Sequence, residues 1–226
     1  MKIKVCGMRE ASNISSVAAL DIDMMGFIFY PKSSRYVMED KLEAEQHNLT
    51  IKSIETLKNN SKSIRRVGVF VDDNPQHILE SVRSYSLNTI QLHGREDRNY
   101  IVALKDLLQT NTLFPITIIK AISVATQDDF SRCNEYEGIV DMLLFDTASA
   151  SKGGSGKQFD WSLLQAYNGN TPFLLSGGIG PDDVSSIRQF HHSQFAGIDV
   201  NSRFESSPGI KDVTKLQTFI QQIKAI

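Results

Sequence analysis

The stretch Pro172–Val184, P-F-L-L-S-G-G-I-G-P-D-D-V, predicts a buried strand that runs into an anion-binding turn and then into a helix. The apolar run 173–175 is typical of a strand that is covered on both faces. Gly177 and Gly178 allow positive φ and let an anion approach the backbone N–H groups closely. Pro181 suits the first position of a helix.

A second strand and loop follow directly. Phe195–Val200 is a strand candidate with Asp199 at its end, and Asn201 and Gly209 lie in the loop beyond it. Two adjacent strand ends that offer N–H groups to one phosphate are typical of the last two strands of a TIM barrel. Either stretch alone also fits an ordinary glycine-containing loop of an α/β protein, whereas the pair in series favours a phosphate site.

The remaining short apolar runs predict six more strands, each followed by a helical pattern. They lie at 2–5, 24–29, 67–71, 89–92, 116–121 and 142–145. Strict alternation implies parallel strands with right-handed crossovers, and 226 residues favour a single closed (β/α)₈ TIM barrel that spans residues 1–226. The alternative is an open doubly wound sheet of the flavodoxin type, which usually has fewer strands.

The sequence signals for helix starts are clear for some helices and unclear for others. Asn13 is the expected N-cap of the first helix, and Asn74 with Pro75 starts the helix after the third strand. A charged helix is expected from about Glu39, and the segment 48–60 fits either its continuation or a second short helix.

The composition is that of an ordinary globular protein and bounds the function. The formal net charge of −2 gives no field that would hold nucleic acid or an acidic membrane surface, so an anionic ligand must be bound locally. Cys6 and Cys133 are too few for a disulfide framework, which favours a reducing cytoplasm. We expect no targeting peptide before the first strand and no membrane span.

In a barrel, the polar residues at the strand ends meet at one mouth. These candidates are Cys6, Arg35, Asp72, His93, Asp146, Ser176 and Asp199. Cys6 fits a nucleophile or base, or a small buried apolar residue, and Asp146 fits a general acid, or a cap or loop hydrogen bond. Arg35 fits a bidentate partner of a substrate carboxylate, or an exposed surface arginine. His93 has no second histidine beside it, which disfavours a zinc or iron site.

Several longer motifs are spread along nearly the whole chain. They are K-V-C-G-M-R (4–9), G-F-I-F-Y-P-K-S-S-R-Y-V (26–37), V-G-V-F-V (67–71), Q-L-H-G-R-E (91–96), F-D-T (145–147), G-G-S-G-K-Q-F-D-W (153–161), L-S-G-G-I-G-P-D-D-V (175–184) and P-G-I-K-D (208–212). Together these motifs resemble those of phosphoribosylanthranilate isomerases. The resemblance implies a (β/α)₈ barrel that catalyses an Amadori rearrangement in tryptophan biosynthesis without a cofactor or metal.

The resemblance also implies roles for individual residues. It makes Cys6 the general base, Asp146 the general acid and Arg35 the contact for the anthranilate ring and carboxylate. It places Gly177, Gly178, Asp199 and Asn201 in the phosphate loops, which act mainly through backbone N–H groups.

One segment departs from the family pattern. Where that pattern reads D-x-S-S-G-V-E, residues 199–205 read D-V-N-S-R-F-E, so that Arg203 replaces a glycine. A glycine with positive φ could not be replaced without strain or a rebuilt turn. We therefore expect Arg203 to lie beside the substrate phosphate, against the alternative of a solvated side chain.

Two rival functions are separable from the isomerase. ProFAR isomerase, a barrel of the histidine pathway, catalyses the same type of rearrangement with an aspartate where Cys6 stands and a substrate with two phosphates. A barrel that binds a phosphorylated metabolite without catalysis would not need both Cys6 and Asp146. The oligomeric state is left open between monomer and homodimer.

Overall fold

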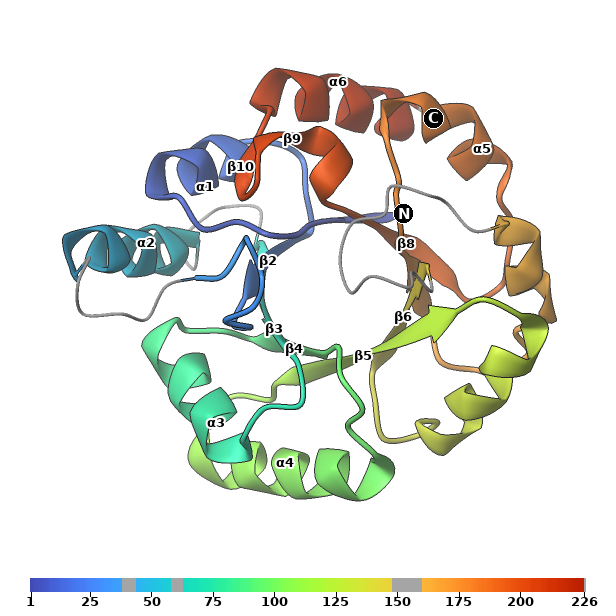
Figure 1. The fold of residues 1–226 in the computed structure, drawn as a ribbon, viewed down its shortest axis with the longest axis horizontal. Helices are drawn as coiled ribbons and strands as arrows, with labels where there is room; N and C mark the ends of the chain where they lie inside the picture. Colours follow the sequence, from blue (N-terminus) through green and yellow to red (C-terminus); the bar gives the residue numbers. More distant parts are fainter. Residues whose placement is uncertain (38–43, 58–62, 148–159, 226) are drawn as a thin grey trace.

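Eight parallel strands close into a barrel in the computed structural model, which describes residues 1–37, 44–57, 63–147 and 160–225. Each strand pairs with the next along the chain, and the last pairs with the first (Figure 1). The predicted TIM barrel is confirmed, because an open sheet would leave the first and last strands unpaired. The strands are β1 (Lys2–Val5), β2 (Met24–Ile28), β3 (Arg65–Phe70), β4 (Thr89–Leu92), β5 (Thr117–Val124), β6 (Met142–Thr147), β7 (Phe173–Leu175) and β8 (Phe195–Val200).

Helices surround the barrel on its outside (Figure 1). The 3-10 helices η3 and η4 follow β5 and β6, where the helical patterns in the sequence are weak. The predicted helix start near Glu39 lies outside the described residues, whereas the part of the 48–60 segment up to Thr56 is helical. The helices are α1 (Ala11–Ala18), α2 (Ala44–Thr56), α3 (Pro75–Ser84), α4 (Arg98–Asn111), η3 (Gln127–Glu135), η4 (Trp161–Ala166), η5 (Pro181–Asp183), α5 (Val184–Gln189), η6 (Ser202–Phe204) and α6 (Val213–Lys224).

The two predicted helix caps have different outcomes. Asn74 caps α3 as expected, since its side chain accepts a 2.8 Å hydrogen bond from the N–H of Gln76. The prediction for Asn13 was wrong: Glu10 caps α1, and Asn13 is buried within the helix. There its amide exchanges hydrogen bonds of 2.9 and 2.8 Å with the backbone of Lys211. A distant backbone partner has overridden the local preference of asparagine for a cap.

Side chains alternate between the two faces of the strands, apart from an irregularity where β7 pairs with β8, and this alternation positions the site. Outward residues such as Ile3 and Val5 pack in the large core between strands and helices. Inward residues form a smaller apolar cluster inside the barrel: Met24, Val67, Ile119, Ala121, Met142, Leu144 and Leu174. Because the period of a strand is two residues, Asp146 lies one layer above Leu144, at the mouth of the barrel.

The segment after β8 contains more structure than the predicted loop. It forms η6 and then the antiparallel strands β9 (Glu205–Ser207) and β10 (Ile210–Lys211). This hairpin returns Lys211 to the side of Glu205, and the two side chains form an ion pair of 2.6 Å.

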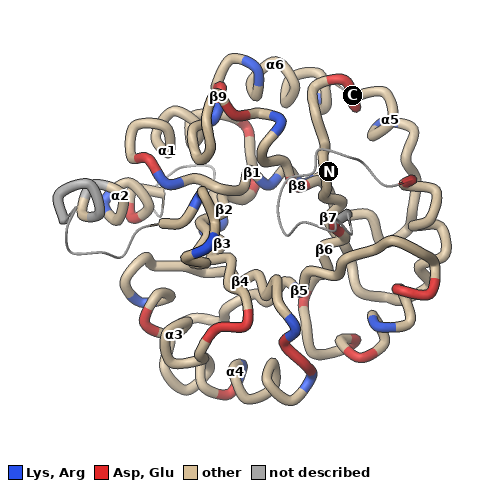
Figure 2. The backbone as a smooth tube through the Cα atoms, viewed as in Figure 1, with Lys and Arg blue, Asp and Glu red and all other residues tan. Residues whose placement is uncertain are grey.

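Acidic and basic residues are interspersed around the molecule (Figure 2). No helix among the described residues combines the length and the hydrophobicity that a membrane crossing needs.

Candidate active site

Cys6 follows β1 and lies at the base of the mouth, with only 4% of its surface exposed. Its N–H donates a 2.9 Å hydrogen bond to the carbonyl of Val200, which holds the residue against β8. A Cβ atom at Gly26 would lie 2.8 Å from the Cys6 sulfur, so the thiol depends on a glycine in the neighbouring strand. Burial raises the pKa of the Cys6 thiol above its ordinary value, although the positive charge of Lys4 opposes this effect.

A buried ion pair lies directly below the thiol. Lys4 Nζ is 2.8 Å from Asp199 Oδ1, and the two side chains are 0% and 7% exposed. The Ser176 hydroxyl lies 3.4 Å from the other carboxylate oxygen. The side chain of Asp199 therefore faces the barrel interior, and its predicted place in a phosphate loop rests on its backbone alone.

Asp146 lies near the end of β6 and faces His93, which directly follows β4. His93 Nε2 is 3.5 Å from Asp146 Oδ2, and the two side chains are 33% and 30% exposed. Gln91 Nε2 lies 2.9 Å from His93 Nδ1. In the closed barrel, β7 and β8 separate β6 from β1 on the shorter side, so Asp146 and Cys6 belong to non-adjacent strands of one mouth.

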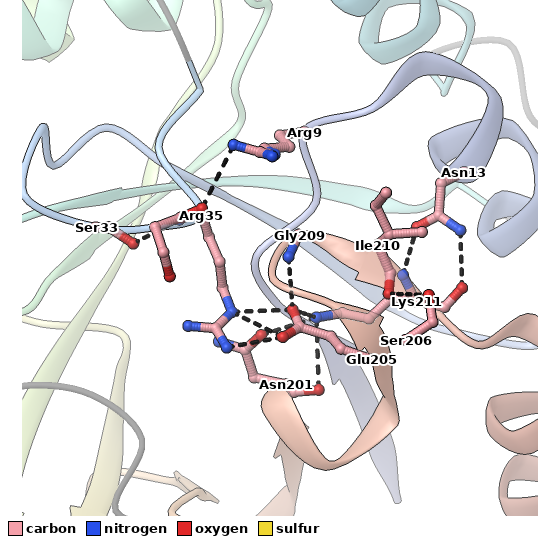
Figure 3. Close-up of polar contacts among 11 residues, drawn as sticks. Arg9, Asn13, Ser33, Arg35, Asn201, Glu205, Ser206, Gly209, Ile210 and Lys211 are labelled. Atoms are coloured by element: carbon pink, nitrogen blue, oxygen red, sulfur yellow. Dashed lines mark hydrogen bonds and ion pairs between the residues drawn. The ribbon is translucent and has the colours of Figure 1, made fainter.

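Arg35 forms an ion pair with a carboxylate of the protein itself, that of Glu205 (Figure 3). Its Nε lies 2.9 and 3.0 Å from the two oxygens of Glu205, and its Nη2 lies 2.7 Å from Oε2. Glu205 also accepts hydrogen bonds from Lys211 Nζ at 2.6 Å and from the N–H of Gly209 at 3.1 Å. Burial raises the pKa of the Glu205 carboxyl, but the bonds from Arg35 and Lys211 outweigh burial and leave the pKa below its usual value.

The two predicted phosphate loops have the expected backbone at their glycines. Gly177 and Gly178 have φ of +91° and +72°, a region that side chains with a Cβ rarely adopt. Farther along, the N–H of Gly180 donates a 2.6 Å hydrogen bond to Asp183. The side chain of Asn201 turns toward Lys211, whose Nζ lies 2.8 Å from its Oδ1.

Arg203 lies in η6, beside the first of these loops. It is absent from the described non-glycine residues with positive φ, which are Ser63, Asp72 and Ser86. The guanidinium Nε would lie 3.2 Å from a Cβ atom built at Gly180. The substitution therefore carries no left-handed backbone strain, and it places an exposed cation next to the glycine loop.

Comparison with known proteins decides the family. The sequence model of the family described as N-(5'phosphoribosyl)anthranilate (PRA) isomerase matches residues 3–222. The chain belongs to this family. A PRA isomerase from Parabacteroides distasonis is 47% identical over 99% of this chain and 93% of the relative. A second one, from Phocaeicola vulgatus, is 43% identical over 99% of this chain and 98% of the relative.

A solved PRA isomerase provides a structural comparison. That protein was determined in complex with reduced 1-(o-carboxyphenylamino)-1-deoxyribulose 5-phosphate. It aligns with a TM-score of 0.73 and 27% identity over the full length of both chains. The likeness supports the same fold for the described part of this chain.

Four polar residues of the candidate site were not singled out from the sequence: Lys4, Gln91, Glu205 and Lys211. Each lies inside a quoted motif or beside a predicted strand, but no local signal shows that it is buried. Lys4 was the most accessible to prediction, because its place on β1 is two residues before Cys6 and therefore on the same face. The partners of Lys4 and Glu205 are 195 and 170 residues away in the chain.

Asp72, the remaining mouth candidate, has a structural partner. Asp72 Oδ1 accepts a hydrogen bond from the N–H of Arg95, which ties together the loops after β3 and β4. Cys133 lies in η3, away from the mouth, and burial raises its pKa to about 12. Within the described ranges, no group of three or more histidine, cysteine or acidic side chains is arranged to hold a metal ion.

Proposed function

We propose that this chain converts N-(5-phosphoribosyl)anthranilate to 1-(2-carboxyphenylamino)-1-deoxyribulose 5-phosphate, with Asp146 as general acid and Cys6 as general base. The observation that carries the proposal is the placement of these two residues at the mouth of one barrel, in which β7 runs into the positive-φ loop at Gly177 and Gly178. Membership of the PRA isomerase family supports the same reaction.

The chemistry requires an acid and a base on separate supports. Asp146 gives a proton to the furanose ring oxygen, the C1–O4 bond breaks, and the anilino nitrogen forms an iminium with C1. The positive charge acidifies the proton on C2, which the Cys6 thiolate removes to give an enolamine. C1 then gains a proton as O2 loses one, which yields the ketone. The protons gained at O4 and C1 balance those lost from C2 and O2.

The surrounding residues support these two roles. The Nε2 nitrogen of His93 faces the Asp146 carboxyl and restricts its orientation. Glu205 holds the Arg35 guanidinium through its Nε and Nη2 edge, so that we assign the remaining edge to the anthranilate carboxylate. For the phosphate we assign the backbone N–H groups of Gly177, Gly178 and Asn201 and the guanidinium of Arg203.

The test is turnover by the purified chain, followed as the loss of phosphoribosylanthranilate fluorescence. Cys6→Ala and Asp146→Asn should each lower kcat by about a hundredfold or more, while binding of the reduced product analogue stays nearly unchanged. Cys133→Ala and the exposed Asp106→Asn are the matched controls and should keep wild-type turnover. Wild-type kcat in Cys6→Ala or Asp146→Asn would refute the role of that residue. Faster turnover of ProFAR than of phosphoribosylanthranilate would assign the barrel to the rival reaction.

A further inference from the structure

A lysine is buried inside the barrel immediately below the proposed base. The side chain of Lys4 is 0% exposed, which is rare for lysine and requires a partner for its charge. Asp199 provides one carboxylate oxygen at 2.8 Å. Burial lowers the pKa of the Lys4 ammonium, but Asp199 and Cys6 together raise it above its ordinary value, so the side chain stays protonated.

The geometry gives this ammonium two anionic neighbours. Lys4 and Cys6 lie two residues apart at the end of β1, so their side chains share the inner face. The strand register pairs Lys4 with Asp199, and the N–H of Cys6 is bound to Val200, the next residue of β8. The ammonium donates a hydrogen bond to Asp199, and its charge also interacts electrostatically with the Cys6 sulfur. Its two partners are therefore a carboxylate and the group that must become a thiolate.

Four charged groups from four parts of the fold act on the thiol. Burial is the largest influence and raises the pKa of Cys6. Lys4 from β1 and Lys211 from β10 lower it, and Asp199 from β8 raises it. Arg35, from the loop after β2, also interacts electrostatically with the sulfur. Of the two lysines, Lys4 has the larger influence on the thiol.

We propose that Lys4 is a positioning residue that stabilises the Cys6 thiolate. Asp199 carries the opposite charge beside the same ammonium and weakens this stabilisation. This inference rests on the proposed function, in which Cys6 removes the C2 proton of the iminium. In that step the thiolate gains the proton and becomes a thiol, while Lys4 remains an ammonium and transfers no proton. Lys4 thus acts only through the sulfur and does not touch the substrate.

Two variants are expected to move the thiol in opposite directions. Asp199→Asn removes the competing carboxylate, so the sulfur gains the full attraction of Lys4 and its titration midpoint should fall by at least about one pH unit. Lys4→Met combined with Asp199→Asn removes both charges, and the midpoint should rise by at least about one pH unit, because the lost attraction of Lys4 exceeds the lost repulsion of Asp199. The double variant contains no unpaired buried charge and should therefore fold.

The measurement is the ultraviolet absorbance of the thiolate in the substrate-free protein as pH is raised. Cys6→Ala provides the baseline. Burial raises the pKa of Cys133 to about 12, so this thiol stays protonated at lower pH and adds no thiolate absorbance there. Opposite shifts in the two variants would support the proposal. Shifts of the same sign, or none, would overturn it, since a purely structural lysine would not distinguish the variants. If Asp199→Asn fails to fold, the double variant decides: a raised midpoint supports the proposal, and an unchanged or lowered one overturns it.

The same variants keep this inference separate from the proposed function. The titration needs no substrate, so its outcome does not depend on the reaction that the protein catalyses. Wild-type turnover in Cys6→Ala would refute Cys6 as the base, whatever the titration shows. If both proposals hold, the pH dependence of kcat/KM should move in the same direction as the thiol midpoint in each variant.

Discussion

The ion cluster of Arg35, Glu205 and Lys211 makes a specific prediction about stability. Glu205→Gln keeps the shape of the side chain and removes its charge. The Lys211 ammonium, which is 0% exposed, then loses its carboxylate partner and is left with neutral acceptors, among them the side-chain oxygen of Asn201 at 2.8 Å and its carbonyl at 3.5 Å. Breaking a buried ion pair by removing one partner costs about 3–5 kcal/mol. For a chain of this size, we expect Tm to fall by roughly 6–20 °C.

The expected loss should depend on Lys211. Lys211→Met leaves Glu205 paired with Arg35, so the loss should be smaller, about 1–3 kcal/mol. The double variant Glu205→Gln with Lys211→Met leaves no buried ammonium, and its loss should fall short of the sum of the single losses by about 1.5 kcal/mol or more. The assay is thermal unfolding followed by circular dichroism at neutral pH. Glu80→Gln on the exposed face of α3 is the matched control and should change stability by less than about 0.5 kcal/mol.

The same cluster predicts that stability falls as the pH is lowered into the acid range. Since the folded pKa of Glu205 lies below its unfolded value of 4.5, its contribution is fully present above that pH. The contribution is lost as pH falls from that value through the folded pKa, and Glu205→Gln should lack this part of the acid dependence. A Tm for Glu205→Gln within about 2 °C of wild type, or fully additive losses in the double variant, would refute the reasoning.

Two further predictions concern the site itself. Arg203→Ala should raise KM for the phosphorylated substrate by roughly tenfold with little change in kcat, because a phosphate is held equally in the ground and transition states. The exposed Arg95→Ala is its control, and an unchanged KM at low ionic strength would remove Arg203 from the phosphate site. Gly26→Ala should lower kcat by about tenfold or more, because the added methyl group would displace the Cys6 sulfur that lies 2.8 Å away. Its Tm loss should shrink in a Cys6→Ala background, and an equal loss in both backgrounds would show that the two side chains do not collide.

Periodicity and glycine chemistry determined much of the architecture. The apolar runs at 89–92 and 173–175 coincide with β4 and β7, because short strands covered on both faces leave a clear pattern between polar segments. The alternation of strands and helices is enough to predict a barrel of parallel strands, and the strand ends then determine which side of the fold carries Cys6 and Asp146. The positive φ of Gly177 and Gly178 was readable for the same reason, since it depends on the residue type itself.

Only the tertiary structure decided which polar groups are paired. Lys4 pairs with Asp199 because barrel closure brings β8 beside β1, and Arg35 pairs with Glu205 because the fold brings the β9–β10 hairpin beside the loop after β2. Asn13 behaves in the same way, as a local signal for a cap that instead binds the backbone of Lys211. A residue's preference for strand, turn or cap acts over a few neighbours, whereas the partner of a buried charge is whichever opposite charge the completed fold places within about 3 Å. That choice belongs to the closed barrel as a whole, because it depends on contacts between segments almost 200 residues apart.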